Sequence, residues 1–213
     1  MRVEPHLMVA RARVRGVEMT RHAAVRFSAS RAFALTTAVA LPRAWQYVND
    51  AAIEGFSRGL EKHAQTAGRA LLQEAFMSAR RKVAARVDAL IEKMRPDVTL
   101  TALMVDAQGL HIMQAGSGRV YVHRAGTHRR FTPREDAEGG ILRHAPISST
   151  APLEPGDLVL AGSTSAFSVK AVGHLASLLS SDPEAPASVI ASILLEPAAQ
   201  AGVGGAVLAM RVQ

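Results

Sequence analysis

Two long segments of helical periodicity lie between two groups of strand-like segments, and this order constrains the fold more than any other feature. In the first segment, apolar residues recur at steps of three and four from Ala44 to Leu60. In the second, the apolar stripe runs from Leu72 to Met94, and Pro96 ends it. The pattern predicts helices that begin at Ala44 and at about Gly68 and pack antiparallel on one sheet.

Strand-like patterns precede and follow this helical part. Residues 7–14 and 23–27 show partial alternation, and residues 33–41 form the continuous apolar run of a central strand. After the helices, four short runs separated by turn residues predict an antiparallel meander, at residues 98–105, 110–115, 120–124 and 129–132. The remaining pattern predicts strands at 158–161 and 206–212 and short helices at 172–179 and 189–195.

The fold class follows from this order. It is an α/β (α+β layered) class, with two packed, mostly antiparallel β-sheets flanked by helix layers, and not a doubly wound parallel sheet. We expect residues 1–213 to form a single domain. Residues 133–152 are polar, lack periodicity and are rich in Pro and Gly, so they are expected to form a flexible flap that folding does not require.

Composition excludes several classes of function. The chain has no cysteine, which excludes thiolate catalysis, iron–sulfur clusters and disulfides. The net charge of +7 suggests nucleic-acid binding, but seven arginines are dispersed among apolar residues over positions 1–31, which favours solvated strand faces. With 4% aromatic residues, stacking on bases has little support. Residues 33–41 are too short for a membrane helix, so we expect a cytoplasmic protein without membrane association.

The candidate reactive groups also have ordinary structural explanations. The eight histidines lack the paired spacing of metal ligands. His123 and His128 flank a basic turn that could hold a phosphate or a nucleic-acid backbone, although a solvated hairpin is the favoured interpretation. The hydroxyl residues between Gly162 and Ser165 do not form a nucleophile elbow and are expected to cap the next helix. The aspartates are scattered through turns, helix faces and loops, where each is expected to serve local structure.

Several local phrases resemble those of the metal-dependent protein phosphatases of the PPM family, the protein phosphatase 2C-like fold. The stretch MQAGSGRVYVHRAG at residues 113–126 is similar to the family's G-D-S-R hairpin. LEPGDLVLAGST at 153–164 is similar to L-x-P-G-D followed by a strand ending in S-D-G, and VGGAVLAMRV at 203–212 takes the place of the closing D-N-x-T strand. VALPRA at 39–44 corresponds to V-x-D-G-x-G-G. The resemblance implies an α-β-β-α sandwich from about Phe33 onward.

The metal-binding aspartates of that family are replaced in every matching phrase. Ala40, Ser163 and Val203 stand where the resemblance implies aspartates, and Ser117-Gly118 replaces the Asp-Ser of the hairpin. Thr20-Arg21-His22 lies where the family's N-E-D phrase is expected. Apolar and small residues cannot neutralise two divalent cations. The resemblance therefore implies a degenerate member with no metal, no cofactor and no catalytic residue.

Three functions remain open at this point. The first is a catalytically inactive domain, a pseudophosphatase that acts as a scaffold or regulator in bacterial signalling or assembly by binding another protein. The second is a diverged metal-dependent Ser/Thr protein phosphatase whose carboxylates lie elsewhere in the sequence. The third is a basic protein that binds nucleic acid or anions, and the first of the three is favoured. The partner's identity and the oligomeric state do not follow from the sequence.

Overall fold

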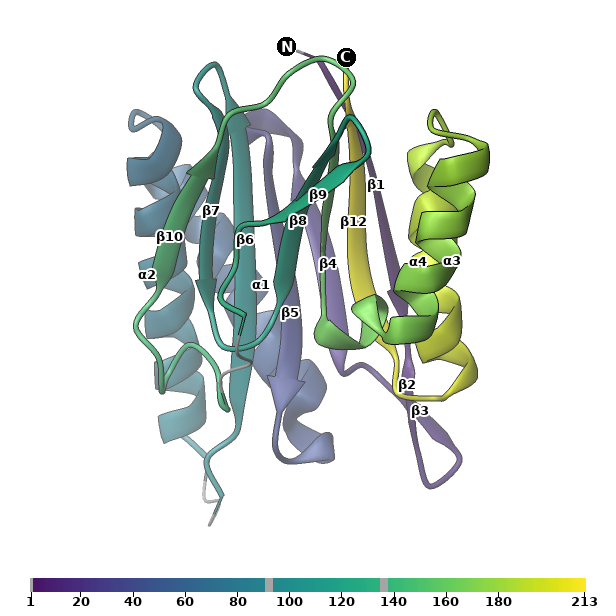
Figure 1. Ribbon diagram of the computed structural model, residues 1–213. Coiled ribbons are helices and arrows are strands. Elements are labelled where there is room, and N and C mark those ends of the chain that lie inside the picture. Colours follow the sequence, from purple (N-terminus) through teal and green to yellow (C-terminus); the bar gives the residue numbers. More distant parts are fainter. Residues whose placement is uncertain (1, 91–93, 135–137) are drawn as a thin grey trace.

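The computed structural model describes residues 2–90, 94–134 and 138–213, and it forms four layers in the order helix, sheet, sheet, helix (Figure 1). One five-stranded sheet has the strand order β10-β7-β6-β5-β4, and the other has the order β1-β12-β11-β8-β9. Neighbouring strands are antiparallel in both sheets. The predicted fold class is confirmed.

The elements have the following bounds. The first sheet consists of β4 (His22–Phe27), β5 (Ala32–Val39), β6 (Asp97–Asp106), β7 (Gly109–Ala115) and β10 (Ile147–Ala151). The second consists of β1 (Val3–Ala10), β8 (Arg119–Arg124), β9 (Thr127–Arg130), β11 (Leu158–Gly162) and β12 (Gly205–Val212). A separate hairpin is formed by β2 (Ala12–Val14) and β3 (Val17–Met19). The helices are α1 (Trp45–Lys62), α2 (Gly68–Asp88), α3 (Val169–Ser181) and α4 (Ala187–Gln200).

Helices α1 and α2 form an antiparallel pair on the first sheet, as predicted. Gly59 lies against Ala75 and Gly55 lies against Ala79, so one helix runs down while the other runs up. Helix α2 ends at Asp88, however, and Met94 is 56% exposed in the loop before β6. The prediction that this helix extends to Met94 was wrong. The apolar repeat in the sequence continues beyond the part of the helix that packs against the core. Residues 91–93 lie outside the described part of the chain.

Alternating side chains divide the core into three layers. On β5, Ala32 and Ala34 face α1 and α2, whereas Phe33 and Leu35 face the second sheet. On β12, Leu208 faces the first sheet. Its neighbours on that strand, Val207 and Ala209, pack against α3 and α4. Both sheets are therefore covered on both faces, which explains why their central strands are continuous apolar runs in the sequence.

The predicted meander is divided between the two sheets. β6 and β7 belong to the first sheet, and β8 and β9 belong to the second. The crossing occurs at Gly116, where φ is +81°, and at Gly118, where a Cβ atom would lie 2.5 Å from the Thr101 hydroxyl. Alternation shows that a segment is a strand but carries no information on which sheet it joins, so the prediction of one meander was wrong.

The segment 133–152 is more structured than the sequence predicts. Strand β10 occupies residues 147–151 and pairs with β7, and Ile141 is fully buried in the core beneath α1 and α2. The interpretation of these residues as one loop was wrong, because a short polar edge strand lacks an apolar pattern. Residues 135–137 lie outside the described part, and the mobility of the segment stays a prediction.

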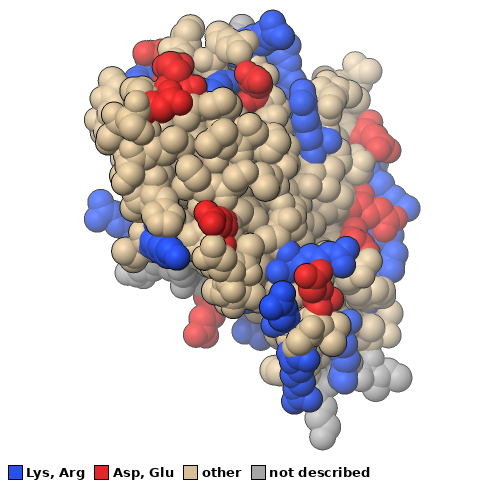
Figure 2. All heavy atoms as spheres, turned by 90° about the vertical axis from the view of Figure 1, so that its right-hand side faces the viewer, with Lys and Arg blue, Asp and Glu red and all other residues tan. Residues whose placement is uncertain are grey.

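The outer surface is uneven in charge. Helices α3 and α4 carry Lys170 and Glu196 as their charged residues, and Figure 2 shows a largely uncharged face over them. Cationic side chains gather at the lower end of that face, the end from which the β2–β3 hairpin projects in Figure 1. None of the described helices has the length and hydrophobicity of a membrane span.

Candidate functional site

A cleft of about 430 Å³ opens at the end of the sandwich where β4 begins and β5 ends. It is lined by three of the positions that the sequence singled out, whereas Ser163 and Val203 are not among its lining residues. His22 is the first residue of β4 and Ala40 follows the last residue of β5, and both line the cleft together with Ser117 of the β7–β8 turn. Ser163 follows β11, and Val203 stands two residues before β12.

Ala40 adopts a backbone conformation that alanine rarely takes. Its φ angle is +68°, in the left-handed region that favours glycine. The buried indole of Trp45 donates a hydrogen bond from Nε1 to the Ala40 carbonyl oxygen at 3.0 Å, and this bond fixes the turn into α1. The Arg21 guanidinium lies 5.4 Å from the centre of the same ring. Alanine, indole and guanidinium thus stand where the resemblance places a metal ligand.

Ser163 joins the ends of two neighbouring strands. Its buried hydroxyl oxygen accepts a hydrogen bond from the Ala206 backbone N–H at 3.2 Å and lies 2.9 Å from the Ser165 hydroxyl. The helix cap is supplied by Ser168, whose hydroxyl accepts from the Ala171 N–H at 3.3 Å. The prediction that the hydroxyls between 162 and 165 cap the helix was therefore wrong. The cap lies later because the chain first makes a 3₁₀ turn at Thr164–Phe167.

His22 is buried at the floor of the cleft. Its Nδ1 lies 3.0 Å from the Thr37 hydroxyl, and its Nε2 lies 3.4 Å from the Val203 carbonyl oxygen. Because a carbonyl can only accept, Nε2 carries the proton and Nδ1 accepts from the hydroxyl. Burial, helped by the positive charge of neighbouring Arg21, lowers the pKa of His22 to about 4. The ring is therefore neutral at pH 7 and links β4 to the segment that precedes β12.

The low pKa of His22 predicts a loss of stability in mild acid. The unfolded chain takes up this proton near pH 6.5 and the folded chain near pH 4, so stability is complete above 6.5 and falls toward 4. At pH 5 the loss is about 2 kcal/mol. Urea unfolding at pH 7 and at pH 5 measures this fall in the free energy of unfolding. In His22→Gln the fall should be smaller than in the wild type by about 2 kcal/mol. Exposed His174→Gln is the matched control, and equal pH profiles for all three proteins would contradict the assignment.

The turn around Ser117-Gly118 is organised by a buried amide. Gln114 Nε2 donates to the carbonyl oxygens of Gly116 and Gly118, each at 3.0 Å. The turn is thus held by one side chain of β7 while the chain passes from the first sheet to the second. Ser117 is left on the wall of the cleft, where the resemblance places the hairpin aspartate.

The charged groups of the cleft are mainly cationic. Arg21 and Arg143 line it from two sides, with the carboxylate of Glu138 at its edge. The Nε of Arg21 is buried without a hydrogen-bond partner among the described residues. Ala40 and Val203 have no side-chain donor atom for a metal, and the Ser163 hydroxyl is already bonded.

These residues do not fit the two-metal centre that the resemblance implies. Two divalent cations need several converging carboxylate oxygens. Within residues 2–90, 94–134 and 138–213, no three His, Asp or Glu side chains come together in a way that could hold a metal ion. Asp136, which the sequence places in the long loop, lies outside these residues.

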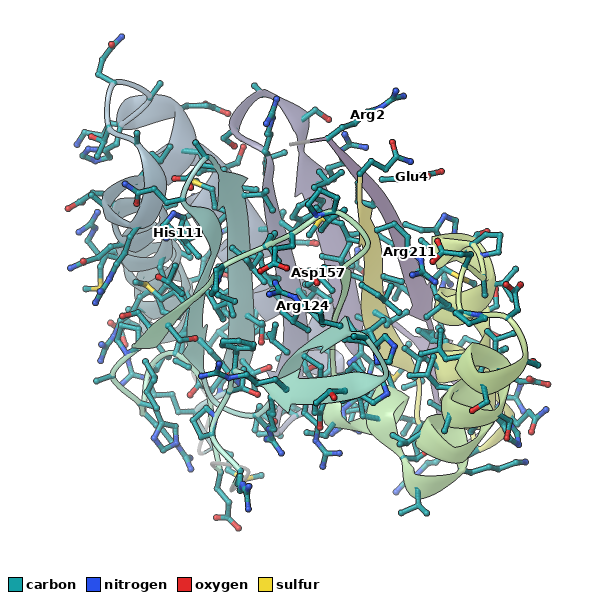
Figure 3. The ribbon with its side chains drawn as sticks, turned by 45° about the horizontal axis from the view of Figure 1, so that its top comes forward. Arg2, Glu4, His111, Arg124, Asp157 and Arg211 are labelled. Carbon is teal, nitrogen blue, oxygen red and sulfur yellow. The ribbon has the colours of Figure 1, made fainter. Side chains whose placement is uncertain are left out.

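Four of the described aspartates have the structural roles that their sequence positions predict. Asp97 accepts hydrogen bonds from three backbone N–H groups, and Asp106 binds the His111 ring and the Gln108 N–H. Asp88 pairs with Arg95 on the surface. Asp157, 1% exposed, accepts two hydrogen bonds from Arg124, each 2.7 Å long (Figure 3).

The basic turn at 123–130 is a hairpin between β8 and β9. The rings of His123 and His128 lie 4.2 Å apart across the two strands, and burial lowers the pKa of both histidines. Arg124 is held by Asp157 and Glu154, and its pKa is raised, first by the hydrogen bond to Asp157. This arginine therefore pairs with two carboxylates of the neighbouring turn.

A second, larger cavity of about 540 Å³ lies at the opposite end of β4 and β5, and no sequence pattern predicts it. Its wall is mostly apolar, formed by Phe27, Leu60, Leu71 and their neighbours, with Asp106 at its edge. The cavity arises where the α1–α2 loop approaches the end of β6, a contact between segments about 40 residues apart. Only tertiary packing brings these residues together.

Comparison with known proteins gives structural relatives only. No protein-family model and no curated protein matches the sequence. The PPM Ser-Thr phosphatase MsPP of Mycobacterium smegmatis superposes with a TM-score of 0.77 at 19% identity, over 99% of this chain and 98% of that one. The serine/threonine phosphatase PstP/Ppp of Mycobacterium tuberculosis gives 0.80 at 16% identity, over 99% of each chain.

A third structure, PppA, is described as a key regulatory component of T6SS in Pseudomonas aeruginosa. It superposes with a TM-score of 0.78 at 15% identity, over 98% of this chain and 97% of that one. At such identities the likeness concerns the path of the chain and not the chemistry of the site. The chain therefore has the fold of the PPM serine/threonine phosphatases.

Proposed function

We propose that this chain is a catalytically inactive phosphatase-fold domain that acts by binding another protein, as a scaffold or regulator in the bacterial cytoplasm. The observation that carries the proposal is the replacement of metal ligands at Ala40, Ser163 and Val203 on an otherwise retained scaffold. A fold can lose its reaction while the surface around the old site still recognises a partner, since function resides in sites.

The contacts made by the replaced positions support this proposal. Ser163 and the Val203 carbonyl now connect strand ends, and the Ala40 carbonyl holds the Trp45 indole. Each of these groups makes a hydrogen bond within the chain, whereas a metalloenzyme would use oxygen atoms at such positions to coordinate a cation. The regulatory role stated for PppA is consistent with a protein of this fold that acts on an assembly.

The alternative is a diverged phosphatase, and it rests on one described carboxylate. Glu138 stands at the edge of the cleft, and Glu135 and Asp136 are close to it in the sequence. Arg21 and Arg143, on the same cleft, repel a divalent cation and so oppose this alternative.

The proposal predicts no turnover in the presence of metal. With saturating Mn²⁺ or Mg²⁺, hydrolysis of a phosphothreonine peptide should be at least about a thousandfold slower than by MsPP assayed in parallel. Calorimetry should detect no micromolar Mn²⁺ site. Combining Ala40→Asp, Ser163→Asp and Val203→Asp should restore metal affinity only in part, because the surrounding ligands are also absent. Metal-dependent turnover by the unmodified chain would establish the enzyme and refute the proposal.

A further inference from the structure

The end of the molecule that holds the cleft also carries a projecting basic hairpin. We define the basic end surface as the hairpin residues Arg11, Arg13, Arg15 and Val17, the cleft residues Arg21, Met94 and Arg143, and Val203. Between positions 11 and 22 the chain has four arginines against one glutamate, Glu18. Their spacing in the sequence favours solvated strand faces and leaves binding of nucleic acid or anions as an alternative.

Three arginines of the hairpin are presented to solvent. Arg11 directly precedes β2, and Arg11 and Arg13 are exposed on either side of buried Ala12, so both point away from the core. Arg15 stands at the turn with φ at +50°, followed by Gly16 at +83°. All three are exposed, and none makes an ion pair or side-chain hydrogen bond with any residue that the structure describes. Glu18 lies opposite Arg13 on β3, so the three arginines leave an excess of positive charge on the hairpin.

The hairpin is held in place relative to the cleft. Ala12, between two of these arginines, is 3% exposed and packs in the core under α1 and α2. The Arg13 N–H donates to the Gly202 carbonyl at 2.7 Å, and the next residue, Val203, accepts from His22 on the cleft floor. The hairpin and the cleft therefore form one continuous, fixed surface, which reduces the entropy lost when a partner binds.

Exposed apolar side chains accompany the arginines. Val17 is 64% exposed, Met94 is 56% exposed and Val203 is 42% exposed, and they lie on the hairpin, at the cleft and between the two. Arginine and methionine are enriched at protein–protein interfaces relative to the rest of the surface. A surface that combines cations with exposed apolar groups is typical of a protein-binding site.

We propose that the basic end surface binds an extended, acidic segment of another protein. Alternate residues of an extended peptide are spaced about 6.5–7 Å apart and point to the same side, so Asp or Glu at every second position can face the exposed arginines. This inference rests on the proposed function in that the chain acts by binding protein, and it specifies the partner's chemistry.

Nucleic acid fits this surface less well. Trp45, the aromatic side chain next to the cleft, is 8% exposed and covered by Arg21, so it offers no platform for stacking a base. Glu18 on the hairpin and Glu138 on the cleft interrupt the positive field that a continuous phosphate backbone would follow. An acidic peptide can place neutral residues opposite these two carboxylates.

Fluorescence anisotropy with a labelled peptide in which Glu alternates with Thr tests the proposal. The wild type should bind this peptide, and should not bind the same peptide with Gln in place of Glu. Combining Arg11→Gln, Arg13→Gln and Arg15→Gln should weaken binding by about tenfold or more, and binding should weaken with added salt. The control combines Arg2→Gln, Arg58→Gln and Arg81→Gln, which removes the same charge from other exposed sites and should leave binding within about twofold.

Either of two results would overturn the proposal. One is equal weakening by both triple variants, which would make the effect one of net charge. The other is that a single-stranded oligonucleotide binds more tightly than the acidic peptide, and that the Arg11→Gln, Arg13→Gln, Arg15→Gln variant no longer binds the oligonucleotide. Circular dichroism establishes that the variants are folded. Since no metal or phosphate is used, phosphatase activity found separately would refute the inactive-domain proposal and leave this surface standing.

Discussion

Asp97→Ala is expected to lower the free energy of unfolding by about 4 kcal/mol. The carboxylate is 3% exposed and accepts from three backbone N–H groups, those of Val98 at 2.8 Å, Gly140 at 2.8 Å and Leu142 at 3.2 Å. Alanine leaves all three donors without this acceptor. The loss exceeds that of a single hydrogen bond because one buried acceptor serves three backbone donors.

The same change should also loosen one wall of the cleft. Asp97 attaches residues 140–142 to β6, and Gly139 and Arg143 on either side of that segment line the cleft. Urea unfolding measures the loss of stability, and anisotropy with the acidic peptide measures the loss at the site. Asp88→Ala, which removes a carboxylate from an exposed ion pair, should change stability by less than about 1 kcal/mol. Similar effects of the two substitutions would show that Asp97 does not anchor the segment.

Gly59→Ala and Gly173→Ala are expected to change stability in opposite directions, although both replace a glycine inside a helix. A Cβ atom at Gly59 of α1 would lie 2.4 Å from the Ala75 Cα atom of α2, so the helices must separate. We expect a loss of about 2–3 kcal/mol. At Gly173 of α3 nothing lies within 4 Å of the added atom, so the higher helix propensity of alanine should add about 0.5–1 kcal/mol.

Thermal and urea unfolding of the two variants decide this point. If Gly59→Ala is neutral, α1 and α2 are not packed backbone to backbone, and the arrangement of the first helical layer is wrong. The pair is informative because helix propensity contributes to both changes equally, so the difference between them reports the helix–helix contact alone.

The layered architecture could be predicted because periodicity is a local property. Each apolar repeat reports which face of its own segment is buried, and the order of repeats limits the layers that can form. The sheet to which a strand belongs is not local. Residues 110–115 and 120–124 look alike in the sequence, yet Gly116 and Gly118 send them to different sheets. Strand β10 was missed for the related reason that an edge strand needs no apolar repeat.

The candidate site was predicted in part. Its positions followed from phrases that resemble those of a known family, and Ala40, Ser117 and His22 do meet at one cleft. The cations around it could not be predicted, because Arg21 and Arg143 are 122 positions apart in the sequence and only the fold places both on that wall. The hydrogen bonds of Ser163 to the start of β12 were equally out of reach.

The order of apolar repeats predicted two sheets between two helix layers, and the composition excludes cysteine chemistry. The sequence also has Ala40, Ser163 and Val203 at the positions where the resemblance implies aspartates. The fold shows where the charges converge and which contacts Ala40, Ser163 and Val203 make. The physical reason is that an apolar repeat reports the burial of its own segment alone. A cleft or a binding surface is formed by strand ends that are far apart in the sequence. The basic hairpin illustrates this difference. Its arginines are evident from the sequence, whereas its position beside the cleft depends on the backbone hydrogen bond from the Arg13 N–H to the Gly202 carbonyl oxygen.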